Sequence, residues 1–270
     1  HIYSRMNWGE PWYAGFRESQ TEYRLKNQPY FQRNMMPAML GWFSLQTATP
    51  VEDVEWMLAR SAGFDAGYAF VVSEESLETN GRSKEILKLL GTWERARMAN
   101  AFTETQKERM KDIKNEFSLK TLGDNVWELT EFSTFRFEHL SKVRQPGEPL
   151  FSTFQFTNQR DNAPMHFILT AKDATLSNIR LEMNRSADYA LPVTLKSGES
   201  LRYYGGEKAS VYDRNLNKTR EIVLDSVFFQ LGKGRQDLVF NCDFMEKKEH
   251  PTAALEVRVP GTPQTIKSPD

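Results

Sequence analysis

The stretch that decides the fold covers residues 36–45 and has the sequence MPAMLGWFSL. Such a nearly continuous apolar run is expected of a strand that is buried on both faces of a sheet. A helix is predicted directly after it, because Thr49 can cap a helix, Pro50 fits a first turn and acidic residues follow. Gly63 ends this predicted helix. The pattern here is therefore a strand followed by a helix.

The same pattern extends to both sides of this stretch. Upstream, a strand is predicted over residues 2–6 and a helix over residues 17–27. Downstream, residues 66–72 are a third apolar strand, residues 73–82 a polar loop and residues 83–111 one long helix. Three strand–helix units predict parallel strands with helices packed outside them.

Three such strands cannot close a barrel, and they would leave apolar strand edges open, which folded proteins avoid. Residues 1–111 are therefore expected to complete a larger structure. The chain also opens at His1 without a methionine and inside a predicted strand. Both observations indicate a fragment whose other strands belong to a missing N-terminal part.

From about residue 117 the apolar residues recur with a period of two, between turn signals. About ten strands at this spacing predict an antiparallel β-sandwich. The strands are expected over residues 132–137, 150–156, 166–171, 179–183, 190–195, 200–204, 221–224, 227–231, 238–244 and 254–259. The predicted domains are residues 1–114, the sandwich over residues 115–260, and an extended tail over residues 261–270.

Composition excludes several functional classes. The chain has 270 residues and a net charge of −1, so nothing steers it toward nucleic acid or an anionic membrane. No apolar run approaches the ~20 residues of a membrane span, and no signal peptide is visible. The single cysteine, Cys242, is expected to be a buried apolar residue. Neither the histidine spacing nor any paired-cysteine pattern predicts a metal or another cofactor.

One short stretch, residues 6–13 with the sequence MNWGEPWY, combines an acid with aromatic side chains. Glu10 is predicted to lie where the first strand ends, which is the edge where α/β proteins bind ligands. Its neighbours suit carbohydrate, because sugar C–H faces pack on aromatic rings and hydroxyl groups need polar partners. The alternative is a helix-start acid favoured by the helix dipole. The neighbours concerned are Asn7, Trp8, Trp12 and Tyr13.

Four segments occur in the order GEPW (9–12), PAMLGWF (37–43), AGFDAGY (62–68) and LGTWERARMA (90–99), and an all-β region follows. This arrangement resembles the last three β/α units and the C-terminal sandwich of a (β/α)8-barrel glycoside hydrolase of multidomain bacterial glycan-degradation type. The fold class that the resemblance implies is α/β plus all-β, with the last third of a TIM barrel followed by a β-sandwich.

The resemblance implies that Glu10 ends the sixth barrel strand and acts as the general acid/base. The acid nucleophile would end the fourth strand, in the missing N-terminal part. The Asn-Glu-Pro motif of another large clan is not matched, since Trp8 and Gly9 separate Asn7 from Glu10. The resemblance further implies a carbohydrate substrate and a periplasmic or secreted location.

Glycoside hydrolysis needs two carboxyl groups, and within this chain Glu74 or Glu75 could supply the second. Both more often lie in a solvated loop at such a place, and Asp65 is on the wrong side of its strand. Trp42 could form the floor of a sugar subsite or fill the barrel core. Ser44 and Gln46 could bind sugar hydroxyl groups or satisfy local backbone.

Two functions therefore remain open. The first is a glycoside hydrolase that uses carboxylate acid/base catalysis, and the second is a non-catalytic carbohydrate-binding or scaffold protein with a degenerate barrel. In the sandwich, aromatic platforms would have to be exposed; the candidates are Trp127, Tyr203, Tyr204 and Tyr212. Asp213–Asn217 resembles part of a calcium loop, but a polar hairpin turn explains it better.

Overall fold

The structure is a computed structural model that describes residues 39–142, 145, 147–186 and 188–269, together with Lys26 and Pro29. The predicted strand over 2–6 and the predicted helix over 17–27, apart from Lys26, lie outside these residues. Among the residues that the structure describes, 20% lie in helices and 46% in strands, so this part of the chain is mostly β. The predicted TIM-barrel fold class is therefore wrong.

The chain forms two compact units. Unit 1 consists of His1–Phe132 and Thr262–Asp270, and unit 2 consists of Ser133–Gly261. The described elements of unit 1 are β1 (Met39–Leu45), α3 (Val51–Phe64), β2 (Gly67–Val72), α4 (Glu74–Thr79), α5 (Ser83–Met98), α6 (Glu104–Lys111), β3 (Glu116–Gly123), the first part of β4 (Val126–Leu140) and β16 (Gln264–Lys267).

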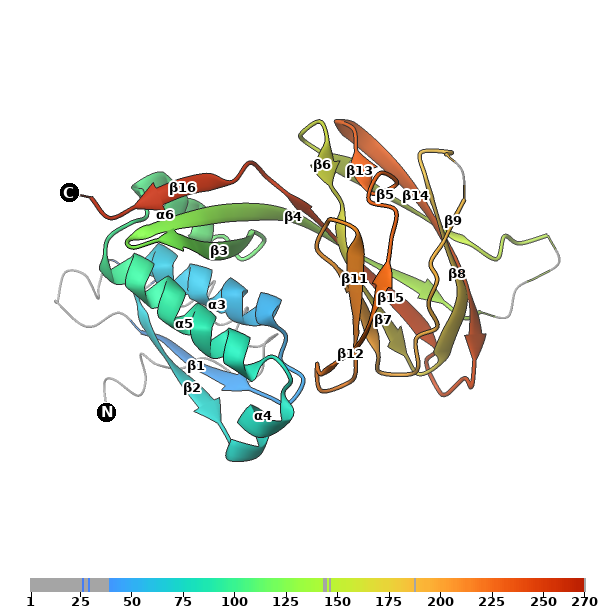
Figure 1. Ribbon diagram of the computed structural model, residues 1–270, viewed down its shortest axis with the longest axis horizontal. Coiled ribbons are helices and arrows are strands. Elements are labelled where there is room, and N and C mark those ends of the chain that lie inside the picture. Colours follow the sequence, from blue (N-terminus) through green and yellow to red (C-terminus); the bar gives the residue numbers. More distant parts are fainter. Residues whose placement is uncertain are drawn as a thin grey trace. The chain divides into compact units, whose positions relative to one another are not determined.

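Strands β1 and β2 form a parallel pair joined by α3, as the strand–helix pattern predicts, but within the described residues their sheet has two strands. The local pattern does not decide how many strands share a sheet. On the other side of α3, β3 and β16 flank β4 in antiparallel pairing. Helix α3 thus packs against β1 on one side and against β3 on the other (Figure 1).

Helix α3 is buried along its whole length, with Asp53 as the one residue that stays partly exposed. Burial on all sides follows from its place between two sheets, and it requires partners for the polar residues of the helix. Glu55 accepts hydrogen bonds from Trp93 Nε1 at 3.4 Å and from the backbone N–H of Leu119 at 3.0 Å. Arg60 donates to the carbonyl oxygen of Asp112 at 3.1 Å.

Two helix predictions are corrected. Residues 73–82 are not a loop throughout, because Ser73 caps α4 by accepting a hydrogen bond from the Ser76 N–H at 3.1 Å. The long helix over 83–111 is two helices, α5 and α6. The break contains Asn100, whose φ of 52° is left-handed, and Thr103, which starts α6 with a capping box.

Unit 2 consists of the second part of β4 and the elements from β5 to β15. These are β5 (Ser152–Asn158), β6 (Ala163–Pro164), β7 (His166–Lys172), β8 (Thr175–Met183), β9 (Tyr189–Ala190), β10 (Ser200–Tyr203), β11 (Lys208–Tyr212), β12 (Lys218–Val223), β13 (Gln230–Leu231), β14 (Gly234–Met245) and β15 (Thr252–Pro260). The alternation does not predict strands β3, β6, β11 and β16.

Most strands of unit 2 lie in two antiparallel sheets, with the orders β12-β11-β10-β7-β15-β4 and β5-β14-β8-β9, and β6 and β13 form a separate antiparallel pair. One core is built from the alternate residues of both sheets. At its centre the ring of Phe229 lies 4.9 Å from that of Tyr203 and 5.4 Å from that of Phe167. Two predicted strands are longer than the observed ones. Of residues 190–195 only Ala190 belongs to a strand, β9, and of residues 227–231 only Gln230 and Leu231 do, in β13.

The predicted tail is also structured in part. Strand β16 pairs with residues 126–129 of β4, and Ile266 is buried in the core of unit 1. Gln106 Nε2 of α6 donates a hydrogen bond to Gln264 Oε1 at 2.7 Å. The C-terminal residues therefore complete the unit that the N-terminal half of the chain begins.

Candidate functional site

The site that the sequence predicts falls into two parts, and the structure describes one of them. The acid and its neighbours lie outside the described residues, so their roles stay predictions; they are Asn7, Trp8, Glu10, Trp12 and Tyr13. The structure does place the remaining candidates, which are Trp42, Ser44, Gln46 and Glu74. Trp42 and Ser44 lie in β1, and Gln46 follows its last residue.

Trp42 points away from the core because β1 is irregular near its start. The register of β1 against β2 shifts between Met39 and Trp42, and Gly41 has a φ of 122°, a conformation that favours glycine. Leu40 and Phe43, three residues apart, are consequently both buried, and 50% of the Trp42 surface is exposed. Trp42 therefore does not fill a core, and the expectation of a strand buried on both faces is wrong.

Ser44 follows Trp42 two residues on in β1, so both side chains leave the strand on the same side. Gln46 lies one residue past the end of β1. The Gln46 side-chain amide Nε2 donates a hydrogen bond to Ser44 Oγ. This contact fixes the orientation of the amide, whose carbonyl oxygen and second N–H remain available for a ligand. The sequence proposal that these residues bind hydroxyl groups is compatible with this geometry.

The loop after β1 is held by a small hydrogen-bond network. The Gln46 backbone N–H donates to Thr49 Oγ1 at 2.8 Å, so Thr49 secures the end of β1 and does not cap α3. Asn80 Nδ2 donates to the carbonyl oxygens of Gln46 at 3.1 Å and Thr49 at 2.9 Å. Asn80 is 3% exposed, and its role was not anticipated, because the sequence signal, an Asn-Gly pair, indicates only a turn.

Strand β2 contributes two apolar residues to the same surface. Ala69 is the register partner of Trp42, and Val71, with 46% of its surface exposed, is the partner of Ser44. We call the surface made by these residues the outer face of β1–β2; it comprises Trp42, Ser44, Gln46, Ala69 and Val71. None of the five side chains carries a charge.

Glu74 is exposed in the first turn of α4, beside Glu75. A carboxylate at this position is stabilised by the N-terminal end of the helix dipole. Because Asn80, which caps the other end of α4, is hydrogen-bonded to the loop after β1, this acidic helix is anchored next to the end of β1. Its role as second carboxylate stays a prediction.

The opposite end of β2 carries a charged cluster. Arg97 donates to Asp65 at 2.8 Å and to Glu94 at 2.8 Å. Burial, with the nearby Glu94 carboxylate, raises the pKa of Tyr68 well above its usual range. The side chain of Asp65 is thus engaged at the amino end of β2, which agrees with discounting it as a catalytic acid.

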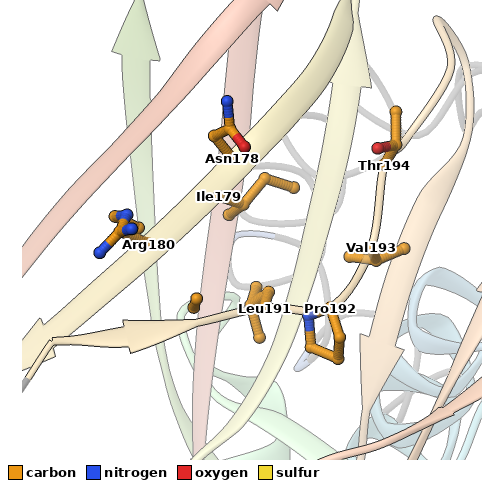
Figure 2. A pocket seen from close by; sticks show the side chains of 8 residues that line it. Asn178, Ile179, Arg180, Leu191, Pro192, Val193 and Thr194 are labelled. Atoms are coloured by element: carbon orange, nitrogen blue, oxygen red, sulfur yellow. The ribbon is translucent and has the colours of Figure 1, made fainter.

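Unit 2 has a shallow pocket of about 300 Å³ beside β8. The segment after β8 is hydrogen-bonded to β8 at Leu191 and again at Leu195. The residues between these two points, Pro192 to Thr194, line the pocket (Figure 2). Two of its polar side chains are already paired. Asn178 Nδ2 donates to Asp243 at 2.6 Å, and Arg180 forms an ion pair with Asp188.

Other sequence candidates in the chain are resolved by burial. Trp127 and Tyr203 are 2% and 0% exposed, so neither is an aromatic platform. Tyr204 is 41% exposed. Asp213 accepts hydrogen bonds from the backbone N–H groups of Asn215 and Asn217, each at 2.9 Å, which confirms the polar hairpin turn between β11 and β12.

The prediction for Cys242 is confirmed, since this thiol is buried and its burial raises its pKa to about 12. Among the residues that the structure describes, no group of three or more His, Cys, Asp or Glu side chains could hold a metal ion. No helix in the described part of the chain is long and apolar enough to cross a membrane.

No protein-family model and no curated protein matches the chain. Among solved structures, a match is the isomalto-dextranase of Arthrobacter globiformis T6 complexed with panose. It has 11% identity and a TM-score of 0.20, over 82% of this chain and 50% of that one. The chain thus spans about half the length of that structure. A likeness of this size does not establish a shared fold.

Proposed function

We propose that the chain binds carbohydrate on the outer face of β1–β2. The observation that carries this proposal is the exposure of Trp42 beside the hydrogen-bonded pair Ser44 and Gln46. An indole ring offers a flat apolar surface to the C–H face of a sugar ring. The amide and hydroxyl groups beside it offer both donors and acceptors to sugar hydroxyls.

The rigidity of the surface favours this role. The strand pairing with β2 holds the backbone of β1, and two hydrogen bonds hold the backbone at its end. The Gln46 N–H donates to Thr49 Oγ1, and Asn80 Nδ2 donates to the Gln46 carbonyl oxygen. A preorganised face loses little conformational entropy when a ligand binds, which raises affinity. Inward-facing Phe43 stacks edge-on against Phe70 at 5.6 Å and anchors the strand from behind.

The test is titration of the protein with neutral glycans, followed by calorimetry and tryptophan fluorescence. Trp42→Ala is expected to weaken binding at least tenfold, which corresponds to about 1.4 kcal/mol. Trp42→Phe, which keeps a ring, should weaken it less. Leu87→Ala is the matched control. Leu87 is an apolar residue of unit 1 with a similar exposed fraction, 55%, but it lies on α5 and not on the outer face of β1–β2. Equal binding by wild type and Trp42→Ala would rule out this site.

Glycoside hydrolysis is a second candidate function, favoured by the acid among aromatic residues in Gly9-Glu10-Pro11-Trp12. In this proposal Glu10 is the general acid/base and Glu74 a candidate for the second carboxylate. Product analysis separates hydrolysis from binding alone. Glu10→Gln should abolish cleavage and leave binding intact, whereas unchanged turnover would end the assignment.

A further inference from the structure

We infer that the outer face of β1–β2 selects uncharged oligosaccharides of two or more linked units, an inference that rests on the proposed carbohydrate binding. The face is a row and not a pocket. Its residues of β1 are spaced two apart, so Trp42 and Ser44 start roughly 7 Å from each other along the strand. The side chain of Gln46 turns toward Ser44, and the two form one polar group.

This spacing sets a minimum ligand length. With single bonds of about 1.5 Å, the ring atoms of a six-membered sugar lie roughly 1.5 Å from the ring centre and its hydroxyl oxygens roughly 3 Å from it. A hydrogen bond of about 2.8 Å extends this reach to roughly 6 Å, which is less than the spacing of the two positions. A ring centred on the Trp42 indole therefore leaves the Ser44–Gln46 pair to the next unit of the chain. A monosaccharide can satisfy the aromatic half of the row or the polar half, and a disaccharide is the shortest ligand that satisfies both.

The charge of the face sets the ligand class. Its five residues carry no charge, and Val71 borders the polar pair with an exposed apolar surface. A uronate or a sulfated sugar would lose hydration at this face without gaining a cation from these five residues. The exposed carboxylates of α4, anchored nearby through Asn80, add repulsion of the same sign. Neutral hydroxyl groups meet neither cost.

The experiment is a length and charge series measured by calorimetry at low ionic strength. The neutral probes are glucose, cellobiose, cellotriose, maltose and maltotriose, and the anionic probe is trigalacturonate. In at least one neutral series the disaccharide should bind at least tenfold more tightly than glucose, with a smaller gain for the trisaccharide. Trigalacturonate should bind at least tenfold more weakly than that trisaccharide.

Two variants connect the length dependence to the row. Gln46→Ala should reduce the gain from glucose to the disaccharide to less than threefold, while Trp42→Ala weakens every probe. Leu87→Ala should reproduce the wild-type series. Equal affinity for glucose and the disaccharides, or tight binding of trigalacturonate that depends on Trp42, would overturn this inference and leave carbohydrate binding intact. Absence of binding by any probe would overturn both.

Discussion

At Gly63 the backbone of α3 passes so close to α6 that a methyl group has no room. A Cβ atom there would lie 2.9 Å from the Lys107 carbonyl oxygen and 2.9 Å from Met110 Cβ. Gly63→Ala must therefore push the helices apart, and we expect the free energy of unfolding to fall by about 1 to 3 kcal/mol.

Urea unfolding followed by circular dichroism measures this effect. Gly91→Ala is the matched control, because Gly91 lies inside α5 and its added Cβ would meet nothing within 4 Å. This control should raise the free energy of unfolding by roughly 0.5 to 1 kcal/mol, since alanine favours helix. Equal midpoints for the two variants would show that α3 and α6 are not in tight contact.

His166 makes the stability of unit 2 depend on pH. Burial, and to a smaller extent the positive charge of Arg258, lowers its pKa to about 4. In the unfolded chain a histidine titrates near pH 6.5, so the unfolded state binds more protons between these values. The stabilisation is complete above about pH 6.5 and is lost as the pH falls toward 4.

Histidine resonances in NMR spectra report this directly, and urea unfolding at several pH values reports the stability. We expect His166→Gln to reduce the fall in the free energy of unfolding over that window. A titration midpoint for His166 near 6.5 would contradict the burial of its neutral form.

At the scale of elements, the start of α6 depends on one capping box. Thr103 Oγ1 accepts from the Gln106 N–H at 3.3 Å, and Gln106 Oε1 accepts from the Thr103 N–H at 2.9 Å. Thr103→Ala removes one of these bonds and should cost about 1 kcal/mol. Thr105→Ala, two residues on in the same exposed turn, should be neutral or slightly stabilising.

Hydrogen exchange at the N–H groups of the first turn of α6 measures this difference. Faster exchange in Thr103→Ala, and unchanged exchange in Thr105→Ala, is the expected result. If both variants exchange alike, the box does not hold the helix start. The capping box also explains why the predicted helix over residues 83–111 is interrupted. The sequence has helical periodicity on both sides of Thr103, but Thr103 is a strong N-cap and therefore starts a new helix.

For the whole molecule, unit 1 is built from both ends of the sequence. Ile266 of β16 is 5% exposed in a core otherwise contributed by residues 40–129. Ile266→Ala is expected to lower the free energy of unfolding of unit 1 by about 2 to 5 kcal/mol. Thr265→Ala is the control, because Thr265 is exposed on the same strand.

Hydrogen exchange monitored by mass spectrometry assigns the effect to a unit. Protection in β3 and in residues 126–129 of β4 should fall in Ile266→Ala and stay unchanged in Thr265→Ala. Loss of protection confined to the last nine residues would mean that β16 contributes nothing to the core of unit 1.

The sequence carried enough information for many of the local elements. Proline and acidic residues predict the start of α3, and Gly63 predicts its end, where the backbone of Asp65 is left-handed. Alternation of apolar and polar residues predicts strands such as β7 and β14. These features depend on neighbours within a few residues. The prediction that β1 and β2 run parallel also follows from the length of the helix that connects them.

The sequence by itself thus determined where several helices and strands lie, and that Trp42 and Ser44 alternate along one strand with Gln46 just after its end. Only the tertiary structure decided that β1 pairs with β2, that β16 adds to the core of the first unit and that Trp42 and Val71 on the outer face of β1–β2 are exposed. The physical reason is that backbone preferences act over a few residues. Burial, in contrast, depends on which distant segments pack together. The same apolar strand sequence is therefore compatible with a barrel strand buried on both faces and with a strand that has one exposed face.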